Sequence, residues 1–176
     1  MEKIYIDEMS KSAIDIEYIK SLYDGNIFEI SFFYKSQFFN SKFLRDYLIL
    51  ILEIIWINGV WVNRLVLMTD ELNNNAIEYW SKEDDLNIMK VIFKKNSDCI
   101  DINIEVIDKW NWKEPKTAEE MEELRNKKTQ IWFDNHNSIR WRGLFLIITK
   151  LVDELYFKNS SDKWLIVWIN KKITAI

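Results

Sequence analysis

The stretch Leu86–Asp108, LNIMKVIFKKNSDCIDINIEVID, decides the fold of this 176-residue chain. Its second half alternates apolar and polar side chains, which is typical of a β-strand with one buried and one solvent-facing side. Asn96-Ser97-Asp98 separates that half from a first apolar run, and these residue types favour turns. We therefore predict a β-hairpin made of Leu86–Lys95 and Cys99–Asp108.

Helical spacing of apolar residues precedes the hairpin. From Lys42 to about Ile57 it predicts a largely buried helix, with Ser41 as its N-cap and Asn58-Gly59 at its end. A second helix is predicted over about Asn63–Tyr79, and its polar side carries candidate functional residues. The apolar segment Asn26–Tyr34, which follows a turn, is predicted to be a strand.

The chain beyond the hairpin begins with a long polar excursion, Lys109–Arg140, which contains the only proline. Within it, Thr117 and Glu120 have the spacing of a capping box and predict the start of a short helix. The apolar spacing of Gly143–Tyr156 predicts a further amphipathic helix, and Lys163–Asn170 is predicted to be an apolar strand.

This order of elements predicts an α+β protein, a two-layer α/β sandwich whose mixed, mostly antiparallel sheet carries helices on one face. The apolar fraction of 48% is enough for a core. We expect a single domain over residues 1–176, in which residues 1–23 form an N-terminal extension with a short helix.

Charge and cysteine content narrow the classes of function. With 24 Lys+Arg against 28 Asp+Glu, the formal net charge is −4, which disfavours nucleic acid as a partner. Cys99 is the only cysteine, and Met1–Ser10 does not resemble a secretion leader, so we expect a cytoplasmic protein. The most apolar stretch, Tyr47–Val62, is too short for a bilayer, and we expect no membrane association.

Glu71 and Asn75 lie one turn apart on the second predicted helix, so their side chains share one side of it. A carboxamide oxygen can ligate Mg²⁺, which prefers few protein oxygens together with water and substrate phosphates. A nearby carboxylate can orient or deprotonate an attacking hydroxyl. Taken alone, the pair is much more typical of a solvated helix surface.

Three sequence motifs, which follow one another along the chain, favour a functional role for the pair Glu71 and Asn75. The segment Glu71–Glu78, ELNNNAIE, resembles the N box of the GHKL ATPase superfamily, which includes gyrase and the histidine kinases. Ile104–Asp108 resembles the strand that ends in the aspartate of that family's D-x-G-x-G box. Arg140–Ile147, RWRGLFLI, followed by LVDEL at Leu151–Leu155, is similar to the R-G-R-G-L-F-L-I signature of the anti-sigma factor serine/threonine kinase branch.

The resemblance implies a GHKL fold and a role for each matching residue. Glu71 would be the catalytic general base, Asn75 the Mg²⁺ ligand, and Asp108 the acceptor for the adenine amino group of ATP. The remaining nucleotide-binding positions would be Trp110 and Trp112, Arg140, Trp141 and Arg142 beside the phosphates, and Gly143 in the phosphate-binding turn. Residues 109–139 would form the ATP lid.

Tryptophan stands where the family motifs have glycine. The D-x-G-x-G box reads Asp108-Lys109-Trp110-Asn111-Trp112, the R-G-R-G motif has Trp141, and Trp80 replaces the last residue of A-I-x-H-G. The chain has 3 glycines and 9 tryptophans. Ordinary usage of about 7% glycine predicts roughly 12 glycines, which the two residue types reach only together.

Two explanations stay open. In the first, the protein is a degenerate family member, a non-catalytic protein-binding module whose tryptophans fill the nucleotide site. In the second, which the glycine deficit favours, UGA codons that the cell decodes as glycine have been translated as tryptophan.

The expected function under the second explanation is that of an ATP-binding regulatory kinase. The resemblance implies transfer of the γ-phosphate of Mg-ATP to a serine or threonine of a small antagonist protein, which itself controls a sigma factor or similar regulator. A homodimer is a further expectation from the resemblance.

Overall fold

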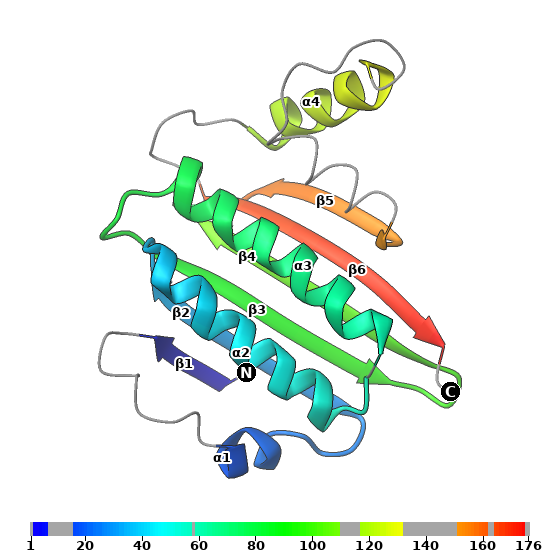
Figure 1. Ribbon diagram of the computed structural model, residues 1–176. Coiled ribbons are helices and arrows are strands. Elements are labelled where there is room, and N and C mark those ends of the chain that lie inside the picture. The colour runs from blue at the N-terminus through cyan, green and yellow to red at the C-terminus, as the bar shows by residue number, and fades with distance from the viewer. Residues whose placement is uncertain are drawn as a thin grey trace.

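A computed structural model of the chain describes residues 2–6, 16–57, 59–109, 117–131, 151–161 and 164–174, and shows one six-stranded sheet (Figure 1). The strands are β1 (Glu2–Ile6), β2 (Ile27–Lys35), β3 (Leu86–Lys95), β4 (Cys99–Asp108), β5 (Glu154–Asn159) and β6 (Leu165–Thr174). They lie in the order β1-β2-β3-β4-β6-β5. β1 pairs with β2 in parallel, and every other neighbouring pair is antiparallel.

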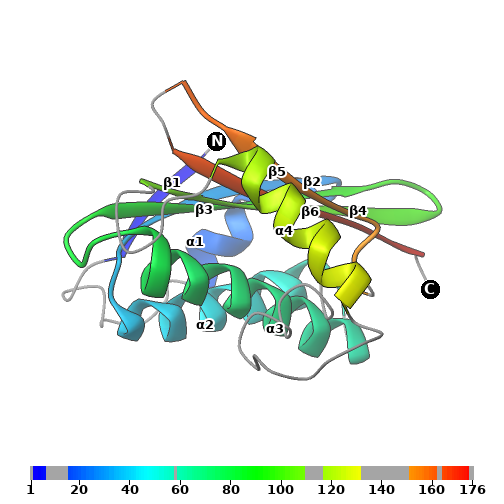
Figure 2. The same ribbon diagram turned by 90° about the horizontal axis from the view of Figure 1, so that it is seen from above.

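The helices are α1 (Ile16–Ser21), α2 (Phe38–Ile54), α3 (Val60–Asn75) and α4 (Ala118–Ile131), and a π-helical turn, η2 (Ala76–Trp80), continues α3. Figure 2 shows α1, α2 and α3 on the same face of the sheet. α4 lies instead alongside β5, the strand at the edge of the sheet (Figure 1). The predicted α+β class with a mixed, mostly antiparallel sheet is confirmed, and the arrangement is compatible with a two-layer sandwich.

The core lies between the sheet and the helices. Alternate residues of the strands point toward the helices and are buried, as the period of two along a strand requires. They include Phe28, Ile30 and Phe32 of β2, Met89, Val91 and Phe93 of β3, Ile102, Ile104 and Val106 of β4, and Val167 and Ile169 of β6. Leu48, Ile51, Leu65, Met68 and Leu72 of α2 and α3 close the core from the other side.

Several predicted elements are confirmed with little change. The hairpin β3–β4 has the predicted bounds, and β2 is displaced by one residue from the predicted Asn26–Tyr34. The capping box at the start of α4 is also present. The Glu120 amide donates to Thr117 Oγ1 at 3.2 Å, and the Thr117 amide donates to Glu120 Oε2 at 2.6 Å.

The predicted start of the first long helix is wrong. α2 begins at Phe38, and Gln37 precedes it, so Ser41 lies inside the first turns and caps nothing. The Ser41 hydroxyl is buried and donates to Asn74 Oδ1 of α3 at 2.8 Å. The Ser41 hydroxyl therefore stabilises the contact between α2 and α3.

The C-terminal part of the predicted helix Gly143–Tyr156 is also wrong. Helix ends at Leu151, and Glu154–Asn159 is strand β5, paired with β6. Residues 143–150 lie outside the described ranges. Asp153 precedes β5 and accepts hydrogen bonds from the Lys171 Nζ at 2.6 Å and the Lys172 amide at 2.7 Å, which ties this junction to β6.

The N-terminal segment contributes more than the short helix that we predicted. β1 adds a strand to the sheet, and Ile6 of β1 and Ile19 of α1 are buried in the same core as the other helices and strands. Among the described helices, none is both long enough and apolar enough to cross a membrane.

Candidate functional site

A row of polar residues crosses the end of the sheet on its helix-covered side. Tyr34 at the end of β2 pairs with Asn87 of β3, and Asp108 at the end of β4 pairs with Leu165 of β6. Asn87 and Asp108 each lie one residue beyond the cross-strand pair Ile88–Ile107. Tyr34, Asn87 and Asp108 are fully buried. Polar side chains at such positions need a structural or functional partner, because an unpaired buried polar group is costly.

The C-terminal half of α3 lies over this row. The Tyr34 hydroxyl donates to Asn73 Oδ1 at 2.7 Å, and the Asn73 amide group lies 3.2 Å from the sulfur of Met89. The pKa of Tyr34 is raised well above its ordinary value, first by burial and second by the negative charge of Asp108. The tyrosine therefore stays protonated, and its hydroxyl connects β2 with α3.

Asn87 joins the row to the π-helical turn. The Ser81 hydroxyl donates to Asn87 Oδ1 at 2.6 Å, and the Ser81 amide donates to the Ala76 carbonyl at 3.0 Å. Within the described ranges, the Asn87 amide nitrogen has no hydrogen-bond acceptor. Asn87 is thus held in place through its oxygen and presents a hydrogen-bond donor next to the position of Asp108.

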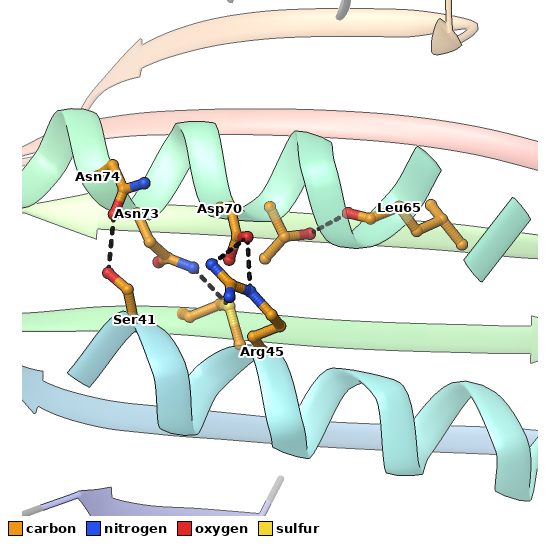
Figure 3. A network of polar contacts seen from close by, with 8 residues as sticks. Ser41, Arg45, Leu65, Asp70, Asn73 and Asn74 are labelled. Carbon is orange, nitrogen blue, oxygen red and sulfur yellow. Dashed lines mark hydrogen bonds and ion pairs between the residues drawn. The ribbon is translucent and has the colours of Figure 1, made fainter. Parts of the chain in front are cut away.

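One side of α3 contacts α2 through a seam of polar pairs, which Figure 3 shows. Arg45 of α2 donates to Asp70 Oδ2 at 2.7 Å, and Ser41 donates to Asn74. Burial raises the pKa of Asp70 and the Arg45 hydrogen bond opposes that shift. These contacts account for the polar residues on this side of the helix as structural ones.

Glu71 and Asn75 lie around the helix from this seam, because each residue advances about 100°. The Asn75 amide nitrogen donates to the Glu71 carbonyl at 2.7 Å. That carbonyl can only accept, so the bond is made by the amide nitrogen and does not use Asn75 Oδ1. A carboxamide oxygen is the atom that would ligate Mg²⁺.

The Glu71 side chain is half-buried, and in the described part of the chain no hydrogen bond or ion pair reaches its carboxylate. Burial raises the pKa of Glu71, and the charge of neighbouring Asp70 raises it further. A raised carboxyl pKa lies closer to neutral pH, which makes the group a better proton acceptor for a hydroxyl. The direction of this shift is compatible with the proton-accepting role that the resemblance implies for Glu71.

The described residues include no group of three or more His, Cys, Asp and Glu side chains that could hold a metal ion. An ion at Asn75 would therefore depend on the phosphate oxygens of a nucleotide and on water for its other ligands. That donor set suits Mg²⁺, which retains waters and binds phosphates.

The structure places some of the predicted site residues and leaves others outside its described ranges. Glu71 and Asn75 share one side of α3, and Asp108 lies on the helix-covered side of β4, against which both α3 and η2 pack. The predicted positions outside the described ranges are Trp110, Trp112, Arg140, Trp141, Arg142 and Gly143. The sequence analysis missed Tyr34, Asn73 and Asn87, whose partners lie far away in the sequence or on another element.

The sequence was also compared with known proteins. It matches no protein-family model and no curated protein.

Proposed function

We propose that this protein binds Mg-ATP as GHKL ATPases do and transfers the γ-phosphate to a serine or threonine of a small antagonist protein. The proposal rests on the motif resemblance and on one structural observation. Glu71 and Asn75 lie on α3, which packs against β4 on the helix-covered side of the sheet. Asp108 is buried on that same side of β4.

The polar row supports binding of a base with adjacent donor and acceptor atoms. An adenine ring presents its amino group next to an acceptor nitrogen. The Asp108 carboxylate can accept from the amino group, and the Asn87 amide nitrogen offers a donor one strand away. Guanine also has neighbouring donors and acceptors, so the choice of ATP rests on the resemblance and is tested below.

The α3 residues support phosphotransfer chemistry. Asn75 Oδ1 would hold Mg²⁺, which neutralises charge on the phosphates. In the transfer, the acceptor hydroxyl oxygen forms a bond to the γ-phosphorus and the bond from that phosphorus to the β,γ-bridging oxygen breaks. Glu71 takes the hydroxyl proton, and ADP leaves with the bridging oxygen.

Calorimetric titration with ATP, in the presence and absence of Mg²⁺, tests the binding step. The protein as printed and a variant with glycine at Trp110, Trp112 and Trp141 are both titrated. We expect micromolar affinity for Mg-ATP in the glycine variant and weaker binding of GTP. If neither form binds Mg-ATP, the proposal is wrong and the non-catalytic protein-binding module replaces it.

A matched pair of variants ties binding to the predicted ligand. Asn75→Ala in the glycine variant is expected to remove most of the effect of Mg²⁺ on ATP affinity, since it deletes the carboxamide oxygen that would ligate the ion. Asn74→Ala is the control, because Asn74 is the adjacent asparagine and contacts Ser41 of α2. Equal Mg²⁺ dependence in the two variants would contradict the role of Asn75.

A further inference from the structure

The end of α2 has a hydrogen-bond pattern that calls for glycine. The Trp56 amide donates to the Glu53 carbonyl at 3.1 Å, and the Ile57 amide donates to the Leu52 carbonyl at 2.9 Å. This pair of bonds defines a Schellman motif, in which the residue after the C-cap adopts a left-handed conformation. Ile55 is the C-cap, so Trp56 occupies that position.

The backbone of Trp56 has the left-handed conformation, with φ of +66°. A β-carbon in this conformation comes too close to the following carbonyl, which is why glycine is the usual residue there. The other described residues with positive φ are Gly25, at +96°, and Gly59, at +63°. Within the described ranges, both glycines are therefore used where φ is positive, and Trp56 is the sole other residue type found there.

No contact of the Trp56 indole with the described residues compensates for this unfavourable conformation. The residue is 79% exposed, and among the described residues no hydrogen bond or ring contact involves its indole. Trp168, by contrast, stacks on Tyr156 with 4.9 Å between ring centroids and donates to Asn103 at 3.1 Å. The ring of Trp61 lies below Arg64 and Lys171. Trp56 is thus distinguished from these tryptophans by both its backbone and its surroundings.

We infer that residue 56 is glycine in the protein as its own cells make it, translated from a UGA codon that those cells read as glycine. The glycine deficit and tryptophan excess of the chain have the same explanation. Because residue 56 lies in the turn between α2 and α3 and belongs to no nucleotide motif, this inference stands or falls independently of the proposed function.

The inference also bears on the candidate site, and in that respect it rests on the proposed function. The same decoding would put glycine at positions 110, 112 and 141, where the GHKL motifs have it. Backbone amides at these positions would then be free of indoles and able to approach a base and phosphates.

The decisive experiment is to read codon 56 in the gene and to measure the mass of the peptide that carries residue 56 from protein isolated from its natural cells. We expect a UGA codon and the mass of a glycine peptide. A UGG codon, or a UGA codon with the mass of a tryptophan peptide, overturns the inference.

Thermal unfolding of variants tests the structural premise. Trp56→Gly is expected to raise the melting temperature by about 3 °C, because it relieves the left-handed conformation. Trp56→Ala keeps the β-carbon and is expected to give no such rise. Trp61→Gly, within the first turn of α3, is the control and is expected to lower the melting temperature, since glycine weakens a helix. If Trp56→Gly lowers it as Trp61→Gly does, the premise is wrong.

Discussion

Two sides of the C-terminal half of α3 carry similar polar residues, but these residues have different hydrogen-bond partners. Toward α2, Asp70 is bonded to Arg45 and Asn74 to Ser41. Around the helix, no partner of the Glu71 carboxylate lies among the described residues, and the Asn75 amide donates to the Glu71 carbonyl one turn earlier. Both sides contain an acid and an asparagine at the same spacing.

The difference distinguishes polar residues that hold α3 against α2 from polar residues without a side-chain partner in the described part of the chain. Asp70 bonds to an arginine of α2, and this ion pair opposes part of the cost of burying the acid. Burial raises the pKa of Glu71 as well, but no arginine among the described residues pairs with it, which makes it the better candidate for a functional acid. Sequence spacing alone does not distinguish them, because Asp70 and Glu71 are adjacent.

The largest expected effect concerns phosphotransfer. Glu71→Gln should slow transfer from Mg-ATP to the antagonist protein by about 10²- to 10⁴-fold, since it removes the proton acceptor, while ATP affinity changes little. The measurement is single-turnover transfer of labelled γ-phosphate. Asp70→Asn is the matched control and should retain most of the rate. Equal rates for wild type and Glu71→Gln would place Glu71 with the structural acids.

The next effect concerns the bond between the sheet and α3. Asn73→Leu should lower the free energy of unfolding by about 2 kcal/mol, because it leaves the buried Tyr34 hydroxyl without its acceptor. Adding Tyr34→Phe should recover part of that loss, since both polar partners are then gone. Urea unfolding of the single and double variants measures this coupling, and additive losses would show that the bond contributes little.

A smaller loss is expected for the seam to α2. Arg45→Ala should lower the free energy of unfolding by about 1 kcal/mol, because the ion pair with Asp70 is partly exposed to solvent. The loss should shrink at high salt, which screens exposed charges. Unfolding of wild type and variant at low and high ionic strength tests this. A loss that does not depend on salt would mean that arginine packing outweighs its charge.

The smallest expected effect is a dependence of stability on pH. Because the pKa of Glu71 is raised in the folded protein, its charged form destabilises the fold above that pKa. Below the unfolded value of about 4.3 the destabilisation is absent. Glu71→Gln should therefore stabilise the protein at pH 7 by less than about 1 kcal/mol, because solvent screens a partly buried charge, and should have no effect below pH 4. A variant that is less stable at pH 7 would contradict the raised pKa.

The parts of the fold that depend on local pattern were predictable. The hairpin β3–β4 has the predicted bounds because strict alternation and a short polar turn admit few other structures. The capping box at Thr117 was found for the same reason. The helices were found from their spacing, although their ends were less certain than their existence.

The features that the local sequence pattern did not predict depend on contacts between residues far apart in the sequence or on different elements. Ser41 had the properties of an N-cap, but its hydroxyl bonds to a residue on the next helix. The segment Leu151–Leu155 had helical spacing, yet Leu155 and Phe157 belong to a strand that pairs with β6. In the site, Glu71, Asn75 and Asp108 followed from motifs, whereas Tyr34 and Asn73 required the fold, because their bond joins residues 39 positions apart.

Helix α4 forms hydrogen bonds with the edge strand β5. An Arg125 guanidinium nitrogen of α4 donates to the Leu155 carbonyl at 2.8 Å, and Asn159 Oδ1 accepts from the Ala118 amide at 2.9 Å. Exposed strand edges are templates on which a strand of another molecule can add. Because α4 bonds to β5 at this edge, we expect it to hinder the addition of a further strand, and we expect Arg125→Ala to lower solubility during expression.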